Sequence, residues 1–156
     1  MGQQPDFSPE GLAAAHDQVM MKFEAIHRLV DELAPERAEF ARTSADVRRI
    51  KAAGKSAILI GVENAYSMGE DIANVQKFYD LGARYMSLAH NGHNQLCDSH
   101  TGESDGVFPF GGLSPLGREV VQEMNRVGIM VDLSHPSVSA VPTTSRGRCG
   151  PAFGYP

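Results

Sequence analysis

The stretch Gly128-Ile-Met-Val-Asp-Leu-Ser-His135 is a short apolar run with strand character that ends in a residue able to bind a metal. Ala57-Ile-Leu-Ile-Gly-Val-Glu63 and Arg84-Tyr-Met-Ser-Leu-Ala-His90 follow the same pattern and end in a carboxylate and in a second histidine. In a parallel α/β barrel, catalytic groups lie where the strands run out into loops. Because glutamate and histidine are zinc ligands, the three runs predict a metal site at one edge of a parallel sheet.

Helical patterns alternate with these strands. Apolar spacing and capping residues predict four helices, over residues 8–33, 43–53, 71–81 and 114–127. Strands that are apolar nearly throughout and that alternate with helices indicate an α/β fold with a parallel sheet between helices. Three strands cannot close a (β/α)8 barrel, which takes about 250 residues. The pattern therefore predicts either a small open sheet or part of a barrel.

Two segments depart from this alternation. Residues 90–112 form a long predicted loop rich in Asn, Gly, Asp and Ser, and a loop of that length in a compact domain is usually functional or mobile. Residues 141–156 are rich in Pro and Gly and show no apolar period, so we expect one domain over residues 1–140 and an irregular tail over 141–156. A frameshift near residue 140 would produce such a tail.

The composition excludes several classes of protein. The chain has 156 residues, 42% of them hydrophobic, and a net charge of −5, which gives no electrostatic reason to expect nucleic acid binding. No apolar stretch is long enough to span a membrane, and no signal segment opens the chain, so the cytoplasm is the default expectation. Cys97 and Cys149 lack CxxC spacing, which favours two free thiols over a redox or zinc-thiolate site.

Each residue at a strand end also has an ordinary structural interpretation. Glu63 could bridge two metal ions, or it could be a solvated or helix-capping carboxylate. His135 could be a zinc ligand or a hydrogen-bonded histidine, and His90 occupies the same position after its own strand. Asp132 lies on the last strand, where it could support a ligand or be a buried, paired acid.

The predicted loop carries two more histidines, His93 and His100. Both fit ordinary loop residues better than ligands. A zinc pair formed by His90 and His93 is an alternative with a weak signal, because the two residues lie on no helix pattern.

Several long, ordered segments between about residues 57 and 139 resemble one family. They are residues 60–63, 78–91, 111–121 and 123–135. Together they are similar to the membrane dipeptidase family, peptidase family M19. The resemblance implies a zinc metallodipeptidase with a (β/α)8 barrel, two zinc ions in the complete site, a dipeptide as substrate and often a homodimer.

The resemblance also implies a role for each residue at a strand end. Glu63 matches the carboxylate that bridges the two zinc ions, and His135 matches a histidine ligand of one of them. His90 matches the histidine that contacts the substrate and stabilises the tetrahedral intermediate. The family has Glu-Gly-Gly or Glu-Gly-Ala where this chain has Glu63-Asn64-Ala65. Since glycine permits backbone angles that asparagine tolerates less well, Asn64 is expected to disturb this turn.

Two of the five metal ligands that the resemblance implies are matched. The His-x-Asp pair of an early strand occurs nowhere in the sequence. The expectation is therefore a partial (β/α)8 barrel with about three parallel strands, an internal piece of a zinc dipeptidase that is inactive alone. The alternatives are a non-catalytic binding or assembly module built from the same barrel segment, and one half of a split enzyme.

Overall fold

The computed structural model describes residues 6–141, apart from the side chains of residues 103–105. Five strands are β1 (Ala38–Phe40), β2 (Ser56–Ile58), β3 (Ile60–Val62), β4 (Ala83–Ser87) and β5 (Met130–Asp132). Four α-helices are α1 (Pro9–Arg28), α2 (Ser44–Ala52), α3 (Ala73–Asp80) and α4 (Pro115–Val127). A π-helix continues α1 over Leu29–Leu33, and 3₁₀ turns cover Ala65–Met68 and His100–Asp105. Of the irregular tail predicted over residues 141–156, all but residue 141 lies outside the described residues.

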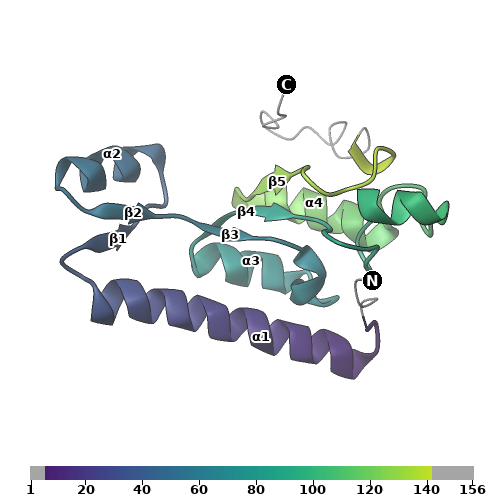
Figure 1. Cartoon of the computed structure of the whole chain (residues 1–156), viewed down its shortest axis with the longest axis horizontal. Helices are drawn as coiled ribbons and strands as arrows, with labels where there is room; N and C mark the ends of the chain where they lie inside the picture. Colours follow the sequence, from purple (N-terminus) through teal and green to yellow (C-terminus); the bar gives the residue numbers. More distant parts are fainter. Residues whose placement is uncertain (1–5, 142–156) are drawn as a thin grey trace.

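The strands form two separate parallel sheets. One has the order β3-β4-β5 and the other pairs β1 with β2 (Figure 1). Parallel strands that alternate with helices along the chain were predicted and are confirmed. The prediction of a single strand over residues 57–62 is wrong in one respect, because the strand is interrupted at Leu59. Leu59 is 55% exposed. β1 was not predicted, since three residues are too few to show an alternating pattern.

The predicted helix starts agree with the observed caps. Ser8 Oγ accepts a hydrogen bond from Gly11 N at 3.1 Å, and Ser114 Oγ accepts one from Gly117 N at 2.9 Å. Proline follows each serine, at a position where a helix needs no backbone N–H. α3 begins two residues later than predicted, because Asp71 Oδ1 accepts from Ala73 N at 3.0 Å and so precedes the helix.

The main hydrophobic core lies between the β3-β4-β5 sheet and the helices. Val75 and Phe78 of α3 and Val120 and Met124 of α4 are completely buried, as is Met86 of β4. α1 packs on α3, where the rings of Phe23 and Phe78 are 5.3 Å apart. None of the helices in residues 6–141 combines the length and apolar character that crossing a bilayer requires.

The opposite face of this sheet is exposed. Tyr85 and Met130 are register partners on neighbouring strands and remain 42% and 50% exposed. Tyr85 also lies over Gly61, where an added Cβ would come within 2.0 Å of the Tyr85 Cζ. Since successive side chains of a strand point to opposite faces, Tyr85 faces away from the core that buries its neighbour Met86.

Cys97 is a free thiol, as predicted, and it is completely buried. Burial raises the pKa of Cys97 to about 12, and the charge of Asp98 acts in the same direction. Because the thiolate is the reactive form, Cys97 is inert at neutral pH. Cys149 lies outside the described residues.

The close approach of α4 to the loop after β4 gives a test of the packing. An added Cβ at Gly117 would lie 2.0 Å from the backbone oxygen of Leu96. Alanine is the better helix former by about 1 kcal/mol. We nevertheless expect Gly117→Ala to lower the free energy of unfolding by about 1–3 kcal/mol, because backbone must shift to admit the methyl group. Urea unfolding followed by circular dichroism measures this loss.

Gln122→Ala is the control, because Gln122 is exposed on the same helix. It should change stability by no more than about 0.5 kcal/mol. A Gly117→Ala variant as stable as this control would contradict the tight contact with Leu96.

Candidate metal centre

The structure brings the three predicted strand-end residues together. Glu63 follows β3, His90 comes shortly after β4, and His135 comes shortly after β5. The Glu63 Oε1 lies 3.1 Å from His135 Nε2 and 3.3 Å from His90 Nε2. One ligand atom from each residue falls within 4.8 Å of the others. Because β3, β4 and β5 are parallel neighbours, their carboxyl ends meet at one edge and place these side chains at a single point.

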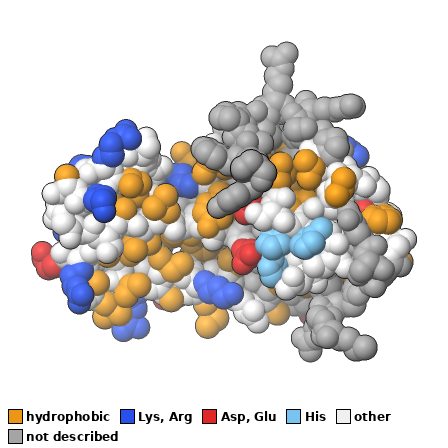
Figure 2. Space-filling view, turned by 45° about the horizontal axis from the view of Figure 1, so that its top comes forward, with side chains coloured by type: hydrophobic (Ala, Val, Ile, Leu, Met, Phe, Trp, Pro, Cys, Tyr) orange, Lys and Arg blue, Asp and Glu red, His pale blue; other side chains and the backbone are white. Residues whose placement is uncertain are grey.

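This cluster, hereafter the Glu63 cluster, is open to solvent on one side. The side chain of Glu63 is 65% exposed, while those of His90 and His135 are 31% and 23% exposed. Figure 2 shows histidine side chains gathered beside an acidic one on this face of the molecule. The rings of His90 and His135 meet edge to face, with centroids 4.3 Å apart. A small molecule can therefore reach the carboxylate from outside, while the rings are fixed by their neighbours.

Two neighbouring residues of the long loop hold the backbone of both histidines. The hydroxyl of Ser99 donates to the carbonyl of His90. The backbone N–H of His100 donates to the carbonyl of His135 at 2.9 Å, and its Nδ1 lies 2.9 Å from the same oxygen. The His100 ring also stacks on that of His135 at 5.6 Å. His100 was predicted to be an ordinary loop residue, but it positions His135. The residues around His100 in the sequence do not indicate its contact with His135.

His93 lies apart from the Glu63 cluster. Its Nδ1 accepts a hydrogen bond from Ser99 N at 3.1 Å and lies 3.6 Å from Asp98 Oδ1. Asp98 is completely buried and accepts from Gly112 N at 2.9 Å. The alternative zinc pair of His90 and His93 is therefore not formed, because the loop turns His93 toward Asp98. The structural role of Asp98 was missed, since nothing in a loop sequence marks an acid as buried.

Asp132 orders the turn that leads to His135. Its Oδ1 accepts from Ser134 N at 2.9 Å and from the Ser134 hydroxyl. Asp132 is only half-buried. The alternative of a fully buried acid is therefore wrong, whereas the bonds to Ser134 fit the other alternative, a residue that supports the strand-end histidine.

Asn64 adopts the backbone conformation that favours glycine. Its φ is +73°, and among residues 6–141 it is the one non-glycine residue with positive φ. Its N–H donates to the buried Ser87 hydroxyl at 2.8 Å, and its Oδ1 accepts from Asn94 Nδ2 at 2.9 Å. These hydrogen bonds hold Asn64 in a conformation that glycine adopts more readily.

The donor set of the Glu63 cluster suits a zinc ion. Carboxylate oxygen and imidazole nitrogen bind zinc at about 2.0–2.2 Å, so two ligands of a tetrahedral ion lie about 3.3 Å apart. The two Nε2 atoms lie at nearly this separation from Glu63 Oε1. His135 Nδ1 is buried and has no hydrogen-bond partner among the residues described. Metal coordination would accordingly use Nε2, the nitrogen that faces Glu63.

The chain is similar to known proteins in sequence and in structure. The family model described as "Membrane dipeptidase (Peptidase family M19)" matches residues 5–147. The chain is similar to "Dipeptidase tcpJ" from Claviceps purpurea (strain 20.1), with 39% identity over 136 residues. That match covers 87% of this chain and 31% of the relative. The chain thus spans about a third of the length of this curated relative.

Two solved structures show the same arrangement of elements. The probable dipeptidase PvdM from Pseudomonas aeruginosa superposes with a TM-score of 0.79 at 26% identity, over 89% of this chain and 35% of that one. A metallo peptidase from Rhodobacter sphaeroides, liganded with a phosphinate mimic of the dipeptide L-Ala-D-Ala, superposes with a TM-score of 0.64 at 26% identity. This second match covers 88% of this chain and 37% of that one.

Two substitutions at Asn64 separate the contribution of its side-chain hydrogen bonds to stability from that of its backbone conformation. Asn64→Gly keeps the positive φ but loses the side-chain hydrogen bonds, so we expect a loss of about 1 kcal/mol in the free energy of unfolding. Asn64→Ala loses the same bonds and adds about 1–2 kcal/mol of backbone strain. Denaturant unfolding should therefore rank wild type above Asn64→Gly, and Asn64→Gly above Asn64→Ala. Equal losses in the two variants would show that the positive φ contributes nothing.

Proposed function

Because the chain belongs to the membrane dipeptidase family, peptidase family M19, we propose that it carries part of the metal centre of a dipeptidase. The observation that carries this proposal is the position of Glu63 Oε1, which lies within 3.3 Å of a histidine Nε2 from each of two neighbouring strands. The proposed reaction is hydrolysis of the peptide bond of a dipeptide. It is proposed for the complete enzyme, since the chain spans 31% of the length of the relative from Claviceps purpurea.

We propose zinc as the metal. Nitrogen and oxygen donors in this combination are typical of catalytic zinc sites. When bound, the metal polarises the substrate carbonyl and lowers the pKa of a coordinated water. Glu63 would hold it through a carboxylate oxygen and His135 through Nε2, the two donor atoms that face each other. The charge of Glu63 also balances part of the positive charge of the ions.

His90 has a different proposed role. Its Nε2 faces the same carboxylate oxygen from the strand between the other two. A proton on that nitrogen can form a hydrogen bond with the carbonyl oxygen of the substrate, which becomes negative in the transition state. The contact of Ser99 with the His90 carbonyl fixes the backbone that carries the ring, so the donor is oriented before the substrate arrives.

We further propose that the 156-residue chain is inactive by itself. Stable zinc sites use three or four protein ligands, and the resemblance assigns two ligands of five to this chain, Glu63 and His135. The exposed side chains of Tyr85 and Met130 on one sheet face fit the same view, because an exposed apolar patch marks a surface that another part of a protein covers. That face also favours a second candidate, an assembly module whose function does not require metal. The closed barrel and the homodimer implied by the resemblance remain predictions.

Zinc binding tests the proposed centre. We expect the wild-type chain to bind zinc, and Glu63→Gln or His135→Ala to weaken binding at least about tenfold, because each removes a donor. Competition with a chromophoric chelator measures the affinity. Glu36→Gln is the matched control, since Glu36 is an exposed carboxylate before β1 and lies outside the cluster. Unchanged zinc affinity in both cluster variants would sink the proposed centre and favour the assembly module.

Activity of the isolated chain tests the second part of the proposal. With zinc added, we expect hydrolysis of a panel of dipeptides to stay at the rate of a protein-free zinc blank, because the remaining ligands are missing. Release of free amino acids is the readout. Hydrolysis that is abolished both by a chelator and by Glu63→Gln would refute inactivity and support the metal centre.

A further inference from the structure

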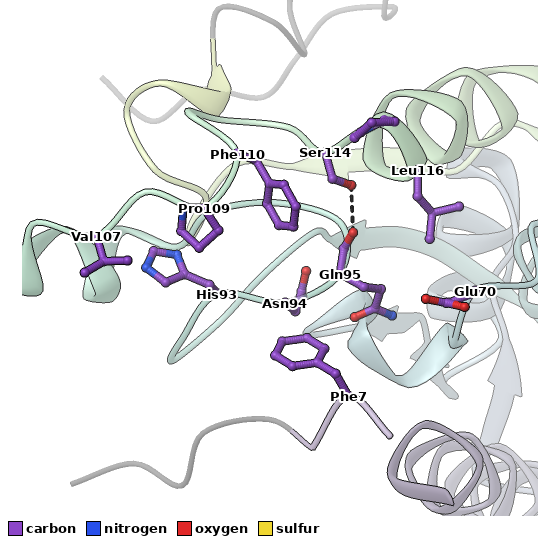
Figure 3. A pocket seen from close by; sticks show the side chains of 11 residues that line it. Phe7, Glu70, His93, Asn94, Gln95, Val107, Pro109, Phe110, Ser114 and Leu116 are labelled. Carbon is purple, nitrogen blue, oxygen red and sulfur yellow. Dashed lines mark hydrogen bonds between the residues drawn. The ribbon is translucent and has the colours of Figure 1, made fainter. Parts of the chain in front are cut away.

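A separate cavity of about 660 Å³ lies beside the long loop and the start of α4 (Figure 3). Apolar side chains from three parts of the chain supply most of its lining: Phe7, Val107, Pro109, Phe110, Pro115 and Leu116. No residue of the Glu63 cluster lines it. Ligand sites are typically cavities of about 300–1,000 Å³ with mostly apolar walls and a few polar groups, so this cavity has the size and character of one.

Two phenyl rings define the walls. In Figure 3, Phe7 lies below the cavity and Phe110 above it. Their residues are 48% and 40% exposed, which leaves apolar surface available to an incoming molecule. Aromatic rings offer apolar contact area and a negative face that attracts cations. These walls therefore fit a flat or compact apolar group better than a polar one.

The floor of the cavity is already formed. Gln95 Nε2 donates to Gly69 O at 2.8 Å and to Tyr66 O at 3.1 Å. The Ser114 hydroxyl donates to Gln95 O at 2.6 Å, as the dashed line in Figure 3 shows. These bonds tie the loop to α4 and to the turn that carries Glu70. A preformed site loses little conformational entropy when a ligand binds.

Glu70 gives the cavity its charge. This exposed carboxylate lines the cavity and lies beside Leu116 in Figure 3. Within the described part of the chain, no ion pair or hydrogen bond satisfies the Glu70 side chain. An unpaired carboxylate at the edge of an apolar cavity favours a ligand that brings its own positive charge and an apolar body.

We propose that this cavity binds a small hydrophobic amine. Its apolar group lies between Phe7 and Phe110, and its ammonium group lies at Glu70. The proposal does not depend on the metal centre, because the two sites share no lining residue.

Isothermal titration calorimetry with three probes tests the proposal on the full chain. Phenethylamine, 2-phenylethanol and 3-phenylpropionate have similar apolar bodies and carry a positive charge, no charge and a negative charge. We expect the amine to bind about threefold to fivefold more tightly than the alcohol, as for a solvent-accessible ion pair, and the carboxylate to bind most weakly. Added salt should reduce the advantage of the amine.

Variants separate the charge from the walls. Glu70→Gln should reduce amine affinity to that of the alcohol and leave alcohol affinity unchanged, whereas Glu36→Gln should change neither. Phe110→Ala should lower the affinity for both the amine and the alcohol. Glu63→Gln should leave amine binding intact. A failure of the amine-site proposal can therefore be told apart from a failure of the proposed metal centre. No detectable amine binding to the wild-type chain, or equal amine affinity with and without the Glu70 charge, would overturn the proposal.

Discussion

The shared contact at Glu63 Oε1 depends on one constraint, the parallel alignment of β3, β4 and β5. Glu63 and His135 are 72 residues apart in sequence and 3.1 Å apart in space. Neighbouring parallel strands end at the same edge of a sheet, so residues that follow them meet there although they are distant in sequence. α3 and α4 serve this alignment, because each fills the crossover between two strands and buries the same face of the sheet.

The arrangement also depends on buried polar residues. Ser87 is completely buried and Asn94 is 1% exposed. Ser87 accepts from the backbone of Asn64, and Asn94 donates to the Asn64 side chain and to Leu88 O at 2.7 Å. These bonds connect the turn after β3 with the loop after β4. Together these bonds restrain the backbone of the turn that begins directly after Glu63.

Short sequence patterns predicted the features of this fold that depend on neighbouring residues, such as helix starts and strand ends. Serine-proline pairs marked the starts of α1 and α4, and apolar runs marked the ends of β3, β4 and β5 correctly enough to select Glu63, His90 and His135. The roles of His93 and His100 could not be predicted, because they follow from contacts across the loop rather than from spacing along it. β1 was missed for a related reason. Its three residues are too few to show a strand pattern, and they form a strand because they pair with β2.

The interruption at Leu59 has a consequence for motion. β1, α2 and β2 form a small lobe (Figure 1) whose buried residues, Ile50 and Ala41, lie outside the main core. Phe40 packs against that core, and Arg84 Nε donates to Arg42 O at 3.0 Å. So small a core resists opening far less than the main one, since local stability follows the apolar surface that a unit buries. Backbone amides of the lobe should therefore exchange with solvent through openings that leave intact the edge of the larger sheet that carries the Glu63 cluster.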